Sequence, residues 1–168
     1  MSPADASRQT PGPVWAQPPV GGSAASVIIP AYNEGAVLER CLRALEPWLR
    51  PEAATPVDVV IVPNGCTDDT ADIARRAATR YARVRVVELP AGSKTAALNA
   101  GDAIATANPR IYLDADIELS PSALPALITA LTTDSARVGS PHVRFDTTDA
   151  DPLVRSFYRI FAGLPYVR

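Results

Sequence analysis

The sequence predicts an α/β protein built on a mostly parallel β-sheet with helices on both faces. Short apolar runs of strand length alternate along the chain with longer segments in which apolar residues recur at helical spacing. The connections between these segments are short, which favours parallel strands joined by right-handed helical crossovers. The chain has 168 residues, 47% of them hydrophobic, and is therefore long enough for one domain with a substantial core.

The first two strands and helices are predicted in the first half of the chain. An apolar run at residues 26–30 predicts the first strand. The helical spacing that follows predicts a helix, which Pro47 is expected to end because proline lacks the N–H that a helix interior needs. A second strand is predicted at residues 57–62, and Thr67 or Asp68 is expected to cap the next helix. The apolar side of that helix is formed by Ile73, Ala74, Ala77 and Tyr81.

The alternation continues in the second half of the chain. A third strand is predicted at residues 83–89, a third helix at 93–107 and a fourth strand at 110–113. A fourth helix follows, with Ser120 as its N-cap and Pro121 at its first position.

Three regions are expected along the chain. Residues 1–24 are rich in Pro, Gly, Ser and Ala and lack the basic start and apolar block of a secretory signal, so they predict a disordered tail. Residues 25–150 are expected to form the domain. Residues 151–168 predict a further helix, with Asp151 as N-cap and Pro152 at its first position.

The composition argues against several classes of function. A net charge of −2 gives no electrostatic reason to expect nucleic acid as a partner. No run of about 18 apolar residues is present, so no transmembrane segment is expected. The two cysteines, Cys41 and Cys66, are too few for a disulfide framework or a zinc site. Together with the missing signal peptide, they favour a cytoplasmic location.

The most informative chemical motif ends the fourth predicted strand, in RIYLDADIELS at residues 110–120. If this segment stays extended, Asp114, Asp116 and Glu118 point to the same side, where like charges repel unless a cation lies among them. A second Asp-Ala-Asp, at residues 149–151, follows a polar loop and precedes a proline, so it predicts only a helix start. Only the first copy therefore predicts a ligand site.

A divalent cation with oxygen ligands would relieve this repulsion. Mg²⁺ and Mn²⁺ are commonly held by one or two carboxylates and completed by substrate phosphates, so the pair predicts a diphosphate ligand. Lys94, the only lysine, stands at the start of a predicted helix and would add positive charge beside those phosphates. Tyr32 would offer a flat face to a base, while Asn64 or Glu34 would hydrogen-bond base or ribose edges. All these residues follow predicted strands, at the sheet edge where ligands bind.

Each of these residues also has a purely structural interpretation. Tyr32 is compatible with a side chain that covers the sheet edge, and Asn64 with the turn that an Asn-Gly pair favours. Lys94 is compatible with a solvated surface charge. Asp68 and Asp69 are better explained as cap and first-turn residues of their helix than as ligands.

Four motifs together resemble the donor-binding half of family 2 glycosyltransferases, inverting enzymes of the GT-A fold. They are VIIPAYNEGAVLERCLRAL, VVIVPNGCTDDTADIAR, GSKTAALNAG and YLDADIEL, in that order. The resemblance covers roughly residues 26–135, and the ordered set is far more specific than any single motif. It implies a GT-A, Rossmann-like fold and transfer of a sugar from a nucleotide-sugar donor, such as a UDP-, GDP- or dTDP-sugar.

The resemblance also implies a role for individual residues. The turn after the first strand and the loop around Asn64 would hold the nucleotide, and Lys94 would lie near the diphosphate. Asp114 would face the ribose or the metal, and Asp116 would bind Mg²⁺ or Mn²⁺ directly, so transfer would depend on the metal. The expected donor-binding residues are Pro30, Ala31, Tyr32, Glu34, Asn64, Lys94, Asp114 and Ala115.

Two features depart from the family pattern. Members often carry Asp-Asp-Gly-Ser where residues 63–66 are Pro-Asn-Gly-Cys, so Asn64 brings hydrogen bonds without charge and leaves the base unidentified. Members also continue into an acceptor-binding half that carries the acidic general base, which is expected beyond Arg168 and leaves the catalytic residue unassigned. The alternative to a transferase is therefore a non-catalytic or truncated nucleotide-sugar-binding module.

The last segment, residues 151–168, has apolar residues at helical spacing with Arg155 and Arg159 between them. It is expected to pack on the absent acceptor-binding half or on another subunit, which would produce self-association. The other open alternative is an interfacial helix that meets a lipid-linked acceptor and places the protein peripherally at the inner membrane face. The acceptor itself is not identified.

Overall fold

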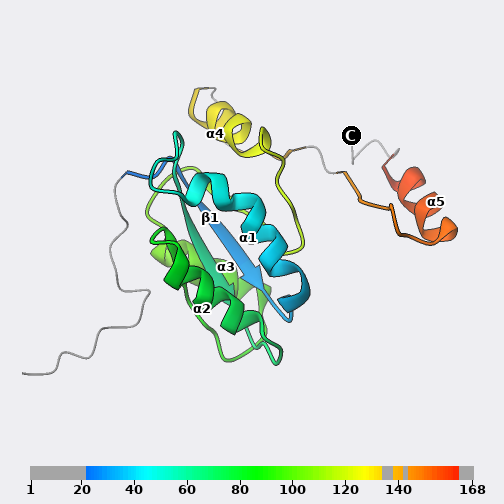
Figure 1. Cartoon of the computed structure of the whole chain (residues 1–168), viewed down its shortest axis with the longest axis horizontal. Coiled ribbons are helices and arrows are strands. Elements are labelled where there is room, and N and C mark those ends of the chain that lie inside the picture. The colour runs from blue at the N-terminus through cyan, green and yellow to red at the C-terminus, as the bar shows by residue number, and fades with distance from the viewer. Residues whose placement is uncertain (1–21, 134–137, 142–143, 163–168) are drawn as a thin grey trace, which may run out of the picture.

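A four-stranded, all-parallel sheet forms the centre of the computed structural model, which describes residues 22–133, 138–141 and 144–162 (Figure 1). The strand order is β3-β2-β1-β4. This confirms the predicted α/β fold with a parallel sheet. The strands are β1 (Ala25–Ala31), β2 (Val57–Pro63), β3 (Val84–Val86) and β4 (Arg110–Tyr112).

Helices follow each strand of the sheet. Figure 1 shows α1 and α2 side by side in front of the strands, with α3 behind them and α4 at one end. Pairs of neighbouring strands are therefore joined by helical crossovers, as the sequence predicts. The helices are α1 (Gly35–Leu49), α2 (Thr70–Arg80), α3 (Lys94–Ile104), α4 (Ala123–Thr133) and α5 (Pro152–Phe161).

The sheet separates two clusters of buried apolar side chains. Val27 and Ile29 of β1 belong to the larger cluster, which includes residues of α1, α2 and α4. Ile28, between them in sequence, belongs to the smaller cluster on the α3 side, because successive strand residues point to opposite faces. Gly101 lets α3 approach closely: a Cβ at this position would lie 2.4 Å from Cγ2 of Ile28.

Helix α1 corrects one expected boundary, since it continues through Pro47 to Leu49. A proline inside a helix costs about 3 kcal/mol. The last turn, however, places Trp48 and Leu49 in the core, where they are 7% and 2% exposed. Burial of side chains of this size contributes about 1.5 to 3 kcal/mol each, which offsets the cost of the proline.

Other boundaries also differ from the prediction. Helix α2 begins at Thr70 and has Asp69, rather than Thr67 or Asp68, at the N-cap position, without a side-chain cap bond. Strand β3 is shorter than predicted, although its continuation still runs along β2, because Leu89 N donates to Pro63 O at 2.9 Å. The start of α5 is as predicted. Asp151 is its N-cap, with its carboxylate accepting from Leu153 N at 2.8 Å, and Pro152 is its first residue.

Helix α4 begins at Ala123 rather than at the predicted Pro121. Ala123 N donates to Ser120 O at 3.0 Å, so the residues between them form a turn that precedes the helix. Leu124 and Ile128 then anchor α4 to the larger core cluster. The regular helix therefore covers the residues around these two buried side chains and does not extend back to Pro121.

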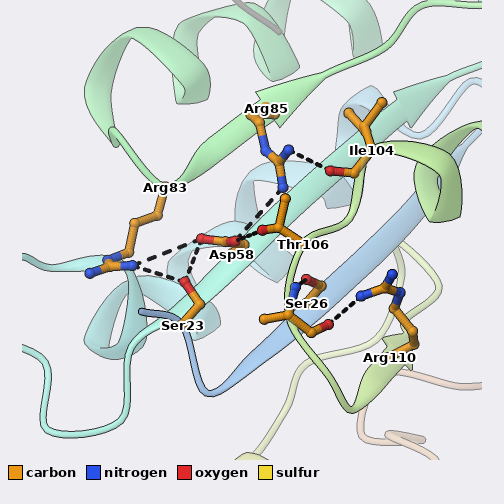
Figure 2. Close-up of polar contacts among 9 residues, drawn as sticks. Ser23, Ser26, Asp58, Arg83, Arg85, Ile104, Thr106 and Arg110 are labelled. Atoms are coloured by element: carbon orange, nitrogen blue, oxygen red, sulfur yellow. Dashed lines mark hydrogen bonds and ion pairs between the residues drawn. The ribbon is translucent and has the colours of Figure 1, made fainter. Parts of the chain in front are cut away.

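A polar network around the buried carboxylate of Asp58 closes the amino ends of the strands (Figure 2). Asp58 accepts hydrogen bonds from Ser23 Oγ at 2.6 Å and from Thr106 Oγ1 at 2.7 Å. Arg85 of β3 and Arg83, the residue before β3, approach the same carboxylate at 3.7 and 3.8 Å. Ser23 lies in the expected tail, of which residues 1–21 are outside the described part of the chain. Its contacts tie the segment before β1 to the sheet.

Among the helices described, none is both long and apolar enough to cross a membrane.

Candidate nucleotide and metal site

A cavity of about 560 Å³ opens at the carboxyl ends of the strands. The site residues come from the end of β1, from the segments after β1, β2 and β4, and from the start of α3 with the two residues before it. β1 lies between β2 and β4, so the strand order brings three of these segments together. The lining residues are Pro30, Tyr32, Glu34, Asn64, Gly92, Ser93, Lys94, Asp114, Ala115 and Asp116.

This lining contains seven of the eight residues expected to bind the donor, together with Asp116. The exception is Ala31, which is buried at the end of β1 and is not part of the lining. Its carbonyl group accepts hydrogen bonds from the backbone N and from Nδ2 of Asn64, at 2.9 and 2.8 Å. Ala31 therefore holds Asn64, a residue of the wall, through its backbone carbonyl.

The turn after β1 is held by the loop after β2. Asn33 has a φ of 53°, a left-handed conformation that asparagine tolerates, and its Oδ1 accepts from Thr67 N at 2.8 Å. Glu34 N donates to Thr70 Oγ1 at 2.8 Å, and Gly35 N donates to Asp68 Oδ2 at 3.0 Å. These bonds fix the backbone that carries Tyr32 and Glu34 into the cavity. Sequence analysis assigned Asp68 to capping and missed Asn33.

Asp68 also accepts from the backbone N and the hydroxyl of Thr70, at 3.0 and 2.5 Å. These bonds, led by the Thr70 hydroxyl, and the one from Gly35 N lower the pKa of the Asp68 carboxyl below its ordinary value. Asp68 therefore stays ionised while it ties α1 and α2 together at their N-termini.

Tyr32 stands exposed at the rim, with 57% of its surface accessible. A Cβ at Gly92 would lie 3.1 Å from the Tyr32 ring, so the ring passes close over the loop before α3. Gly92 is a lining residue that sequence analysis missed, although glycine before a helix start is a signal for such close approach. The free face of the ring is available to a planar ligand.

The segment after β4 does not stay extended, which corrects the expected arrangement of its three carboxylates. Ile117 N donates to Asp114 O at 3.1 Å and closes a turn, and Ala115 is buried in the core cluster. Asp114 and Asp116 both line the cavity. Glu118 instead forms an ion pair with Arg40 of α1, at 2.6 Å. The turn thus leaves two of the three acidic side chains in the site.

Lys94 lies opposite this turn. Its Nζ donates to Asp114 Oδ1 at 2.7 Å. Ser93, before it, is the N-cap of α3, because its Oγ accepts from Ala96 N at 3.2 Å. The positive end of the α3 dipole and the Lys94 ammonium therefore meet at the same wall of the cavity, which favours an anionic group there.

The rest of the site is acidic. Burial raises the pKa of Glu34, and the nearby charges of Asp116 and Asp114 raise it further. Three carboxylates thus share the cavity with one lysine. A cation at Asp114 and Asp116 would relieve their mutual repulsion.

The carboxylate oxygens of Asp114 and Asp116 fit a magnesium or manganese ion whose coordination is completed by a bound ligand. Among the described residues, no group of three His, Cys, Asp or Glu side chains is arranged to hold a metal ion. The carboxylates of Asp114 and Asp116 would therefore supply part of the coordination. Mg²⁺ ordinarily takes one or two carboxylates and completes its shell with phosphates and water.

Comparison with known proteins gives a consistent result. The family model for glycosyl transferase family 2 matches residues 26–166. An uncharacterized glycosyltransferase of Escherichia coli K12, YibD, is 31% identical over 115 residues, which are 67% of this chain and 32% of that protein. The chain therefore spans about a third of the length of this relative.

Two solved structures share the fold. Glucosyl-3-phosphoglycerate synthase from Mycobacterium tuberculosis, in complex with UDP, superposes with a TM-score of 0.58 at 27% identity, over 86% of this chain and 53% of that one. The mannosyltransferase PcManGT from Pyrobaculum calidifontis, in complex with GDP-Man and Mn²⁺, gives a TM-score of 0.54 at 27% identity, over 77% and 38%.

Proposed function

We infer the function of this chain from its family, because the chain belongs to glycosyl transferase family 2. We propose that it binds a nucleotide-sugar donor in the cavity at the carboxyl ends of the strands and serves the transfer of the sugar to an acceptor. The observation that carries the proposal is the meeting of Lys94, Asp114 and Asp116 in one cavity. One ammonium group and two carboxylates suit a diphosphate that is bound together with a metal ion.

The proposed donor occupies the cavity in a defined order. The base lies against Tyr32, and Glu34 lies within reach of ribose or base edges. The diphosphate faces Lys94 and the N-terminus of α3. Pro30, Asn64 and Ala115 form the wall between these groups. Solved family-fold structures with UDP or with GDP-Man support this class of ligand.

Mg²⁺ or Mn²⁺ is the proposed cofactor, held by Asp116 with Asp114 beside it. When bound, the ion stabilises the negative charge of the nucleoside diphosphate leaving group. The chain's own part is to hold the diphosphate in place: Lys94 adds a second positive group, and the α3 N-terminus adds backbone N–H donors. The loop contacts from Asp68 and Asn33 keep Tyr32 and Glu34 in fixed positions.

The alternative is a module that binds the donor without transferring the sugar. Asp146 is an acidic residue near the end of the described chain. Its carboxylate accepts hydrogen bonds from the hydroxyl and the backbone N of Thr148, and these bonds, the hydroxyl bond first, lower its pKa. A lowered pKa makes this carboxylate a weak general base, so Asp146 is not proposed as the base of the transfer. Transfer of labelled sugar from UDP-, GDP- and dTDP-sugars to a membrane-extract acceptor mixture separates the two.

The acceptor and cellular location belong to the proposal as well. We propose an acceptor that is lipid-linked, a cytoplasmic location and peripheral contact with the membrane face or self-association through α5. Its exposed apolar residues and the positive charge on Arg155 and Arg159 support these two kinds of contact. The exposed apolar residues of α5 are Leu153, Val154, Phe157 and Ile160. The free thiols of Cys41 and Cys66 agree with a reducing compartment.

Calorimetry with UDP, GDP and dTDP tests the donor site. We expect one of them to bind with Mn²⁺ present and to lose at least tenfold in affinity with a chelator or in Asp116→Asn. Asp149→Asn is the matched control, because Asp149 begins the second Asp-Ala-Asp of the chain. Equal affinity with and without chelator would refute the metal, and no binding of any of the three would refute the site.

A further inference from the structure

Asn64 lies buried at the end of β2, in the wall of the cavity, with 2% of its surface accessible. Its Nδ2 donates to Ala31 O at 2.8 Å and to Val62 O at 3.3 Å. Its Oδ1 accepts from Ser93 N at 2.9 Å. An amide side chain has two N–H donors and one carbonyl oxygen, so both donors and one lone pair are used within the protein.

These three bonds join segments that are distant in sequence. Ala31 ends β1, Val62 belongs to β2, and Ser93 is the N-cap of α3. Lys94 is the residue directly after Ser93. The Asn64 amide therefore fixes the point at which α3 begins relative to the two central strands, and with it the origin of the Lys94 side chain.

The segment between β3 and α3 is also held near Leu89, by bonds that do not involve the Asn64 side chain. Gly65 N donates to Leu89 O, and Leu89 N donates to Pro63 O, each at 2.9 Å. Both are backbone bonds, so neither depends directly on the Asn64 side chain. The contribution of Asn64 is thus confined to the junction at Ser93.

We propose that Asn64 is a positioning residue for Lys94 and the N-terminus of α3, and that it does not read the base of the donor. The proposal rests on the proposed function, since it assigns the diphosphate to Lys94. In this chain an amide makes bonds at this position that the aspartate often present in family members cannot make. An aspartate has no N–H to donate, and its charge would face the carbonyl oxygens of Ala31 and Val62 in a buried place.

The first arm of the test needs no ligand. Amide hydrogen exchange is followed residue by residue in the wild type and in Asn64→Ala. The amide of Ser93 is expected to exchange at least about tenfold faster in the variant, while the amides of Leu89 and of the second half of α1 keep their rates. An unchanged rate at Ser93 would overturn the proposal.

The second arm measures binding of UDP and GDP beside the bare nucleosides uridine and guanosine, with Mn²⁺ present. Asn64→Ala is expected to weaken the nucleoside diphosphate that binds the wild type by about tenfold and to change the nucleoside by less than about twofold. In a Lys94→Ala background, the same substitution is expected to cost less diphosphate affinity than it does in the wild type, because only the contribution of the α3 N-terminus is left to lose. Equal losses for nucleotide and nucleoside would place Asn64 on the base and overturn the proposal.

Two further outcomes are distinguishable. If Asn64→Ala does not fold, Asn64→Leu, which keeps the volume of the side chain while removing its three bonds, is measured in both arms with the same expectations. If the folded wild type binds neither UDP nor GDP, the proposed function fails for these donors. The exchange rate of the Ser93 amide then still decides whether Asn64 positions the start of α3.

Discussion

Lys94 and Asp114, twenty residues apart in sequence, form an ion pair in which Nζ and Oδ1 are separated by 2.7 Å. Their side chains are 64% and 54% exposed. An ion pair this exposed stabilises a protein by only about 0 to 1 kcal/mol, because water screens it. The pair therefore does little for the fold, and Lys94 is free to exchange the carboxylate for a phosphate oxygen.

Substitution of Lys94 tests this exchange. We predict that Lys94→Ala weakens binding of the nucleoside diphosphate by about 1 to 3 kcal/mol, the scale of a hydrogen bond to a charged group. Binding of the bare nucleoside is expected to stay nearly unchanged, because the proposed positions of the base and ribose are away from the lysine. Calorimetry with both ligands gives the result, and the free energy of unfolding should change by less than about 1 kcal/mol.

Arg76→Ala is the matched control for this prediction, since it removes an exposed cation on α2 whose ion pair with Glu39 lies outside the cavity. It should leave both affinities unchanged. An equal loss for nucleotide and nucleoside in Lys94→Ala would place the lysine elsewhere in the site.

The buried carboxylate of Asp58 provides a stability prediction. Asp58→Ala is expected to lower the free energy of unfolding by about 3 to 5 kcal/mol, because it leaves the charge of Arg85 buried without its partner. Burial already lowers the pKa of Arg85, and Asp58 acts in the opposite direction. Nη1 of Arg85 donates to Ile104 O at 2.5 Å, whereas Nη2 has no hydrogen-bond partner among the residues that the structure describes. Urea denaturation measures the loss.

Glu88→Ala is the comparison for Asp58→Ala, because Glu88 pairs with Arg75 at 2.5 Å on the surface. This exposed pair is expected to contribute less than about 1 kcal/mol. Similar losses in the two variants would mean that the network of Figure 2 adds no more than a surface ion pair.

The sequence was informative about elements and about the edge at which the site forms. Hydrophobic periodicity depends on each segment alone, so strands, helices and their order could be predicted. The residues around the second Asp-Ala-Asp were also enough to predict its role. Asp151 is the N-cap of α5, as predicted. The clustering of polar residues after strands predicted that Tyr32, Lys94 and Asp114 would meet.

Contacts between loops could not be predicted in the same way. The side chain of Asn64 bonds to Ala31, Val62 and Ser93, and this choice depends on which segments become neighbours after folding. The turn after Asp114 likewise depends on the burial of Ala115 in a core that no local pattern describes. The residues that line the cavity could therefore be predicted better than the bonds between them.

The two cysteines are expected to differ in reactivity. Burial, with smaller effects of Asp116 and Glu118, raises the pKa of Cys41 to about 12. At pH 8 the thiolate is then about one part in ten thousand, and the thiolate is the reactive form. Native protein at pH 8 should therefore react through Cys66 alone, and denatured protein through both. Mass spectrometry after iodoacetamide treatment counts the modified thiols, and native Cys66→Ser should stay unmodified.

Gly65 provides a prediction that joins the fold to the site. It has a φ of +63°, and a Cβ at this position would lie 2.4 Å from the backbone N of Gly92. Backbone atoms cannot rotate away as a side chain can, so Gly65→Ala must shift the loop before Ser93 and Lys94. We predict a loss of about 1 to 3 kcal/mol in the free energy of unfolding, from the unfavourable φ and the displaced loop. Gly22→Ala, whose Cβ would meet no atom of the described residues within 4 Å, is the control and should be neutral. Lys94 directly follows this loop, so Gly65→Ala should also weaken nucleoside diphosphate binding about as much as Lys94→Ala does. Full affinity in a folded Gly65→Ala variant would show that the position of the lysine does not depend on the loop.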